Sequence, residues 1–97
     1  MAVHSISVTS SGIVYTGRCY FHGFYVGGMD GTNDATVTIH DNVAASGNTI
    51  VPAHATDAAS PQRLGGAMQH VGEQCELGIY VTITCSGTAT VTCKVEA

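Results

Sequence analysis

The feature that most constrains this chain is a succession of short segments in which apolar and polar residues alternate. Val, Ile, Thr and Tyr dominate these segments, and clusters of Gly, Asn, Asp and Ser separate them. Alternation with a period of two places the apolar side chains on one face of a strand, and no segment repeats with the period of a helix. Leucine, a common helix former, occurs only at Leu64 and Leu77. The sequence therefore predicts an all-β fold.

The alternation predicts seven to eight short strands in a single domain that covers residues 1–97. The predicted strands span residues 3–9, 13–15, 18–26, 35–40, 48–51, 67–71, 79–85 and 89–95. Pro52 is expected to end the strand at 48–51, and residues 72–76 are expected to form a turn. Residues 53–66 are the least regular segment, rich in Ala and polar residues, and are expected to form a loose loop or an arm that reaches a neighbour. Many short strands in so short a chain indicate an antiparallel β-sandwich or a jelly roll.

The predicted strand 18–26 contains most of the aromatic residues. On a regular strand one face carries Tyr20, His22, Phe24 and Val26, and the other carries Cys19, Phe21 and Tyr25. A strand that is apolar on both faces is either central in the fold or covered by a partner. Tyr20, His22 and Phe24 are therefore either a second core face or residues of an interface. Gly23 in the middle of the strand predicts a bulge or a bend.

The last two predicted strands are expected to pair as a hairpin. Their apolar residues all have odd numbers, from Ile79 to Ile83 and from Ala89 to Val95. Only a loop with an odd number of residues places both apolar sets on one face of a hairpin. A three-residue loop of Cys85, Ser86 and Gly87 meets this condition, with Gly87 in the left-handed conformation.

The charge balance and the short apolar runs argue against two classes of partner, nucleic acids and membranes. Charged residues make up 10% of the chain, and three basic residues stand against seven acidic ones, for a net charge of −4. Binding to phosphates needs clustered Lys and Arg, so no nucleic-acid partner is expected. No apolar run is long enough to cross a bilayer and no signal peptide is visible, so neither a membrane nor export is expected. A domain so poor in charge is either partly covered in its working state or simply a neutral β-domain.

The four cysteines and five histidines follow no spacing typical of a metal site. There is no Cys-x-x-Cys pair, and Cys19 and His22 face opposite sides of a regular strand. Without an export signal the thiols are expected to stay reduced and to pack as small hydrophobes, with a disulfide formed after cell lysis as the alternative. The stretch 30–34 is expected to be a plain turn rather than a calcium loop. We therefore expect neither a metal ion nor a cofactor.

No catalytic constellation is visible in the sequence. It contains neither the Gly-x-Ser-x-Gly turn of serine hydrolases nor a glycine-rich phosphate loop that opens a helix. An enzyme would require an unusual titration of His22 or His40 beside a carboxylate, which the sequence cannot show. We therefore expect a structural or binding role, with no catalytic residues.

Two stretches of the chain resemble a known group of proteins. Residues 35–47 read ATVTIHDNVAASG, a strand followed by an Asp-Asn turn that closes at Ser-Gly. Residues 77–84 read LGIYVTIT, and SGTATVT follows at 86–92. This arrangement resembles the small β-sandwich proteins of tailed bacteriophage particles, and the resemblance extends from Gly17 to the end of the chain. The group includes capsid decoration (cement) proteins and small tail or head-fibre modules.

The resemblance implies a decoration protein on the outer capsid surface of a virion, assembled in the cytoplasm of the bacterial host. Such a protein binds the major capsid protein and bridges neighbouring capsid subunits, often as a homotrimer, and so stabilises the head. The alternatives are a tail, neck or fibre module and a ligand-binding β-sandwich outside the virion. The candidate interface residues are Tyr20, His22, Phe24, His54, Pro61, Arg63 and Leu64. The N-terminal residues 2–7 are a further candidate for contact with the capsid, and the arm 53–66 is either such a contact or a solvated loop.

Overall fold

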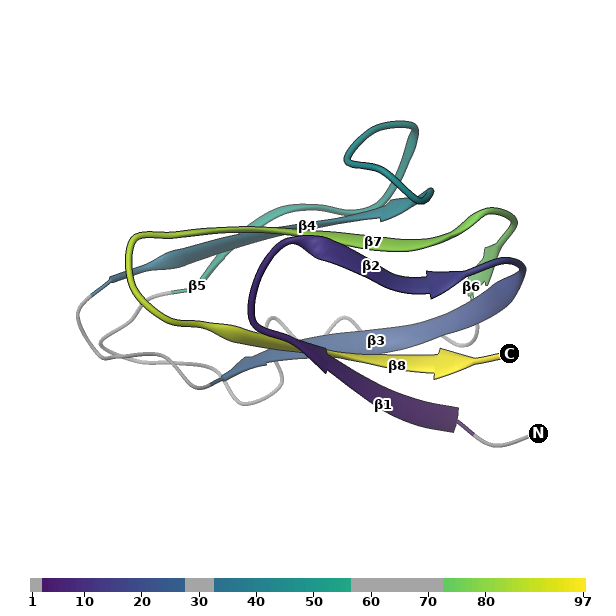
Figure 1. Ribbon diagram of the computed structural model, residues 1–97, viewed down its shortest axis with the longest axis horizontal. Coiled ribbons are helices and arrows are strands. Elements are labelled where there is room, and N and C mark those ends of the chain that lie inside the picture. The colour runs from purple at the N-terminus through teal and green to yellow at the C-terminus, as the bar shows by residue number, and fades with distance from the viewer. Residues whose placement is uncertain (1–2, 28–32, 57–72) are drawn as a thin grey trace.

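The protein is a sandwich of two four-stranded antiparallel sheets (Figure 1). The computed structural model describes residues 3–27, 33–56 and 73–97. One sheet has the strand order β1-β8-β3-β6, and the other has the order β2-β7-β4-β5. The strands are β1 (Val3–Val8), β2 (Gly12–Thr16), β3 (Cys19–Gly27), β4 (Ala35–Asp41), β5 (Asn48–Thr56), β6 (Glu73–Cys75), β7 (Gly78–Cys85) and β8 (Thr90–Glu96). The predicted all-β sandwich is confirmed.

The core lies between the inner faces of the two sheets, as the alternation predicts. In β4 the apolar residues Val37 and Ile39 are fully buried, while the intervening Thr38 is half-buried on the outer face. Phe21 of the first sheet and Ile79 of the second belong to the same buried cluster. Burial of these large side chains contributes about 1.5–3 kcal/mol each.

The last two strands do not form the predicted hairpin. β7 pairs with β2 and β4, whereas β8 pairs with β1 and β3, so the connection between them crosses from one sheet to the other. Figure 1 shows this crossing as the arc at the left of the molecule. Val81 and Val91 both point into the core, but from opposite sheets. Gly87 is not among the described glycines with a positive φ, so the predicted bulged turn is also wrong.

β5 is longer than predicted, because Pro52 does not end it. The strand continues through Pro52 to Thr56 at the edge of its sheet. Proline is tolerated on edge strands, where its missing N–H can face away from the neighbouring strand. The pairing with β4 also shifts here, so Pro52 lies in an irregular stretch between the pairs Ile39–Val51 and Val37–His54. Residues 53–56 of the predicted irregular arm therefore belong to β5.

The turn predicted at 72–76 is also wrong, because Glu73–Cys75 forms the short strand β6 against β3. The predicted strand 67–71, residues 57–66 of the predicted arm and most of the turn at 30–34 lie outside the described residues. The loop after β4 closes as predicted, because the Asn42 side-chain amide donates a hydrogen bond to the Ser46 carbonyl oxygen at 2.9 Å.

Candidate functional site

A bulge in β3 determines which side chains reach the surface of the first sheet. The pairing of β3 with β8 shifts between Phe21 and Gly23, and Gly23 has a φ of 135°. A bulge of this kind reverses the alternation of faces along the strand. Phe24 therefore joins Phe21 in the core, at 3% exposure, and Tyr25 turns outward, opposite Thr92.

This arrangement corrects the predicted set of aromatic interface residues. Gly23 does introduce a bulge, but Phe24 does not share a face with Tyr20 and His22. Phe24 is a core residue, whereas Tyr20 is 36% exposed and His22 is half-buried on the outer side. We refer to the following outward-facing residues of this sheet as the outer face: Val3, Ser5, Ser7, Tyr20, His22, Tyr25, Gln74, Thr92, Lys94 and Glu96.

Cross-strand contacts connect most of these side chains. The Nε2 atom of His22 lies 2.8 Å from the Glu96 carboxylate, and each side chain is about a quarter exposed. The Lys94 ammonium donates a hydrogen bond to Ser5 Oγ at 2.7 Å and lies 5.9 Å from the centre of the Tyr25 ring. Exposed pairs of this kind contribute at most about 1 kcal/mol each to stability. Their main effect is to hold charged and aromatic groups in defined positions on rigid strands.

The β1 edge of the same sheet differs from the other three sheet edges. β5 carries Pro52 and two register shifts, β2 has a register shift within a five-residue strand, and β6 has only three residues. Interruptions, prolines and short edge strands all hinder pairing with a further strand. β1 instead forms six consecutive pairs with β8 without a shift, and it contains no proline and no Asp, Glu, Lys or Arg. Among the described edges, β1 is therefore the best suited to accept another strand.

The remaining predicted interface residues are not brought to this surface by the described part of the chain. His54 lies on β5 of the opposite sheet, where its backbone pairs with Val37. Pro61, Arg63 and Leu64 lie outside the described residues. Residues 3–7 of the N-terminal segment predicted as a further capsid contact lie on β1. That β1 is a sheet edge was not predicted, because strand order is needed to know which strands are edges.

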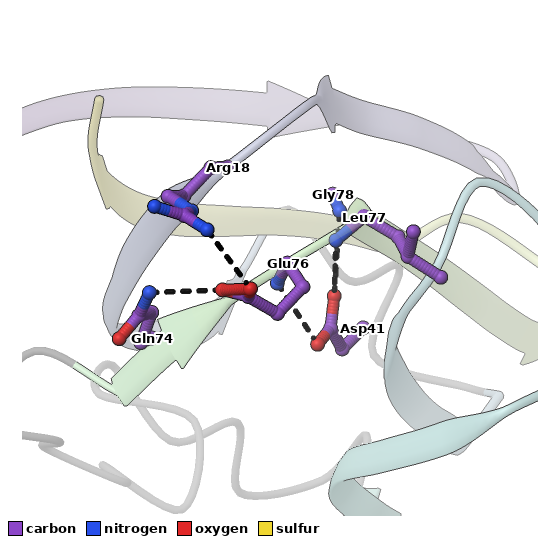
Figure 2. A network of polar contacts seen from close by, with 6 residues as sticks. All are labelled: Arg18, Asp41, Gln74, Glu76, Leu77 and Gly78. Atoms are coloured by element: carbon purple, nitrogen blue, oxygen red, sulfur yellow. Dashed lines mark hydrogen bonds and ion pairs between the residues drawn. The ribbon is translucent and has the colours of Figure 1, made fainter.

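A second polar cluster, at the crossing from β6 to β7, was not predicted (Figure 2). The Asp41 carboxylate accepts hydrogen bonds from the backbone amides of Glu76, Leu77 and Gly78 at 3.1, 3.0 and 3.4 Å. The Glu76 carboxylate in turn pairs with Arg18 at 3.1 Å. Asp41 thus connects the end of β4 to residues 76–78, which lead from β6 in one sheet to β7 in the other. This position indicates a structural role for Asp41.

No disulfide joins the four cysteines, all of which belong to the described residues. Cys19, Cys75 and Cys93 are buried, and Cys85 is half-buried. Burial raises the pKa of Cys93 to about 12 and also raises the pKa of Cys19, so both favour the neutral thiol. Within residues 3–27, 33–56 and 73–97, no three His, Cys, Asp or Glu side chains converge as a metal site would require.

His22 is the only one of the two suggested acid–base histidines for which a carboxylate contact is found in the described structure. The contact with Glu96 places an imidazole beside a carboxylate, and polar contacts of this kind between neighbouring strands are common in sheets without catalytic activity.

No described helix is long and apolar enough to cross a membrane. Comparisons of the chain with protein-family models, with curated proteins and with solved structures return no match.

Proposed function

We propose that this chain is a structural protein of a bacteriophage particle, a decoration protein that binds the outer capsid surface and bridges neighbouring capsid subunits. The proposal combines the sequence resemblance with one structural observation, the uninterrupted and uncharged β1 edge beside an outer face with two tyrosines. Its partners are the major capsid protein and further copies of the chain, and its role is structural rather than catalytic.

The β1 edge provides a physical means of attachment. An added strand forms backbone hydrogen bonds with a net value of about 1 kcal/mol each, and several such bonds form together. Tyrosine is enriched at interface centres because it adds apolar area and a polar tip, and Tyr20 and Tyr25 lie on the adjacent outer face. Oligomerisation would increase the strength of attachment through the high effective concentration of linked copies.

The first test is the number of copies in the particle. Purified virions of the phage that encodes the chain are analysed by quantitative mass spectrometry, with the major capsid protein as the reference. We expect on the order of hundreds of copies per particle, because a decoration protein occupies repeated sites on the shell. A few copies to a few tens would instead indicate a tail, neck or fibre module. Complete absence would contradict both virion hypotheses and favour a ligand-binding domain.

The second test asks whether β1 carries the attachment. Val3 on β1 and Ile13 on β2 are matched, since each is an apolar residue on an edge strand, with 47% and 49% exposure. Lysine on an edge strand opposes the addition of a further strand. When purified variants are added to particles that lack the chain, we expect Val3→Lys to reduce binding at least about tenfold, a loss of about 1.4 kcal/mol. Ile13→Lys is expected to bind normally, and equal binding by the two variants would contradict the role of β1.

A further inference from the structure

Two of the buried cysteines face each other across the first sheet. Cys19 on β3 and Cys75 on β6 are direct partners in the antiparallel register. Both side chains lie in the core, and a hydrogen bond joins the two thiol groups. Directly opposed residues of antiparallel strands have Cα atoms about 4.5–5.5 Å apart, which falls within the range of about 4.4–6.8 Å seen in disulfides.

The other two cysteines have no such arrangement. In the register of the sheets Cys93 lies opposite Ile6 on one side and Phe24 on the other, and Cys85 lies opposite Ala35. Among the described strand pairings, Cys19 with Cys75 is therefore the one cysteine–cysteine pair.

We propose that Cys19 and Cys75 are a redox-sensitive pair that closes to a cross-strand disulfide when the protein meets a small disulfide oxidant. One protein thiolate attacks a sulfur of the oxidant, which forms a mixed disulfide and releases one thiolate. The second protein thiolate then attacks the protein sulfur of the mixed disulfide, forms the Cys19–Cys75 bond and releases the other half of the oxidant. The protein loses two protons and two electrons, and the oxidant takes up both and is reduced to two thiols.

Local opening of β6 gives the oxidant a route to these buried groups. β6 has three residues, lies at the edge of its sheet and pairs only with β3 among the described strands. Short edge strands open at a lower free energy than the centre of a sheet. Once the mixed disulfide has formed, return of β6 to its place in the sheet brings the two sulfur atoms together.

The disulfide would link β6 covalently to β3 and close a loop of the chain that contains β4 and β5. Closure of a long loop restricts the unfolded chain and commonly raises stability. Attachment of β6 also supports the neighbouring crossing to β7, where Asp41 binds the backbone. The reduced protein would then be the form present in a reducing compartment, and the oxidised protein would be the more stable form outside it.

The test uses the full chain, with oxidised glutathione as the oxidant. The remaining thiols are blocked with N-ethylmaleimide, and intact-mass measurement then distinguishes an internal disulfide from a glutathione adduct. Trypsin separates Cys19 from the other cysteines by cleavage at Arg63, and a glutamate-specific protease isolates Cys75 between Glu73 and Glu76. The two digestions together identify the linked residues.

We expect one internal disulfide between Cys19 and Cys75 that dithiothreitol reverses, with a rise in Tm of at least about 10 °C. The control Cys85→Ala is expected to behave as the wild type, because it leaves the pair intact. Cys75→Ala is expected to lose both the cross-link and the oxidant-dependent rise in Tm. A different linkage, the absence of an internal disulfide while Cys85 becomes glutathionylated, or a cross-link without a rise in Tm would overturn the proposal.

Discussion

The sharpest stability prediction concerns Gly78, the first residue of β7 after the crossing from β6. Its φ is 143°, and a methyl group at this position would lie 2.3 Å from the carbonyl oxygen of Tyr15 and 3.3 Å from the Cα atom of Thr16. Both neighbours belong to the backbone of β2, which cannot rotate away as a flexible side chain would. Gly78→Ala must therefore combine backbone strain with a displacement of β2.

The expected loss can be divided into these two parts. A side chain at positive φ costs about 1–2 kcal/mol. Displacement of β2 disturbs the pairs Tyr15–Ile79 and Thr16–Gly78, and each backbone hydrogen bond lost costs about 1 kcal/mol. The sum is about 3–4 kcal/mol, which corresponds to a fall in Tm of about 12–30 °C for a domain of this size.

Two other glycines of the same region serve as matched controls. A methyl group at Gly17 would meet open space, but the φ of 106° is also positive, so Gly17→Ala should cost only the strain of about 1–2 kcal/mol. A methyl group at Gly12 would also meet open space, and Gly12 is not among the residues with positive φ. Gly12→Ala should therefore be neutral or stabilise the fold by up to about 1 kcal/mol.

Urea unfolding followed by far-UV circular dichroism measures all three variants, since the chain contains no tryptophan for fluorescence. The difference between Gly78→Ala and Gly17→Ala isolates the overlap with β2. If Gly78→Ala loses no more stability than Gly17→Ala, the close approach of β2 and β7 is not as described and the reasoning fails.

Three further predictions use the same measurement. Phe24→Ala should lower the free energy of unfolding by about 3–5 kcal/mol, whereas Tyr20→Ala on the outer face should lower it by about 1 kcal/mol or less. Similar losses for the two variants would contradict the reversal of faces at the bulge. Asp41→Ala should lower the free energy of unfolding by about 2–3 kcal/mol, because three backbone amides lose their hydrogen-bond acceptor, and Asp41→Asn should lose less. If the stability of Asp41→Ala equals that of the wild type, the crossing from β6 to β7 does not depend on the carboxylate. Burial raises the pKa of Cys93 from 9.0 to about 12, so the unfolded chain releases this proton at a lower pH than the folded protein does. Stability should therefore be complete below about pH 9 and fall between about pH 9 and about pH 12, by up to about 1.4 kcal/mol per pH unit, and Cys93→Ala should remove that part of the slope.

The alternation in the sequence predicts burial well but does not predict strand partners. Val81 and Val91 are buried as expected, yet they lie on different sheets. A hairpin and a crossing between sheets both direct the same alternate residues into the core, so the pattern of polarity is the same in the two cases. Among the described strands, β4 and β5 are the only consecutive pair that shares a sheet, and local turn signals therefore carried little information on topology.

The candidate site could be predicted only in part, for a related reason. Gly23 indicated a bulge, but its effect on Phe24 and Tyr25 depends on which residue of β8 faces the extra residue of β3. The bonds of Asp41 to the amides of residues 76–78 join segments far apart in the chain, and no local pattern marks such contacts. The pairing of Cys19 with Cys75 has the same long-range origin.

The proposed interaction surface depends on the position of β8 between β1 and β3. β1 pairs only with β8 among the described strands, and the outer-face contacts of Lys94 with Ser5 and of Glu96 with His22 both start from β8. Until β8 is in place, β1 has no described partner, and neither contact can form. A strand with an unpaired edge is prone to non-specific association, so the pairing of β1 with β8 covers one of the two edges at which β1 could aggregate. With one side of β1 paired to β8, only the other side is open among the described strands, so the attachment proposed above would have a single orientation relative to the sheet.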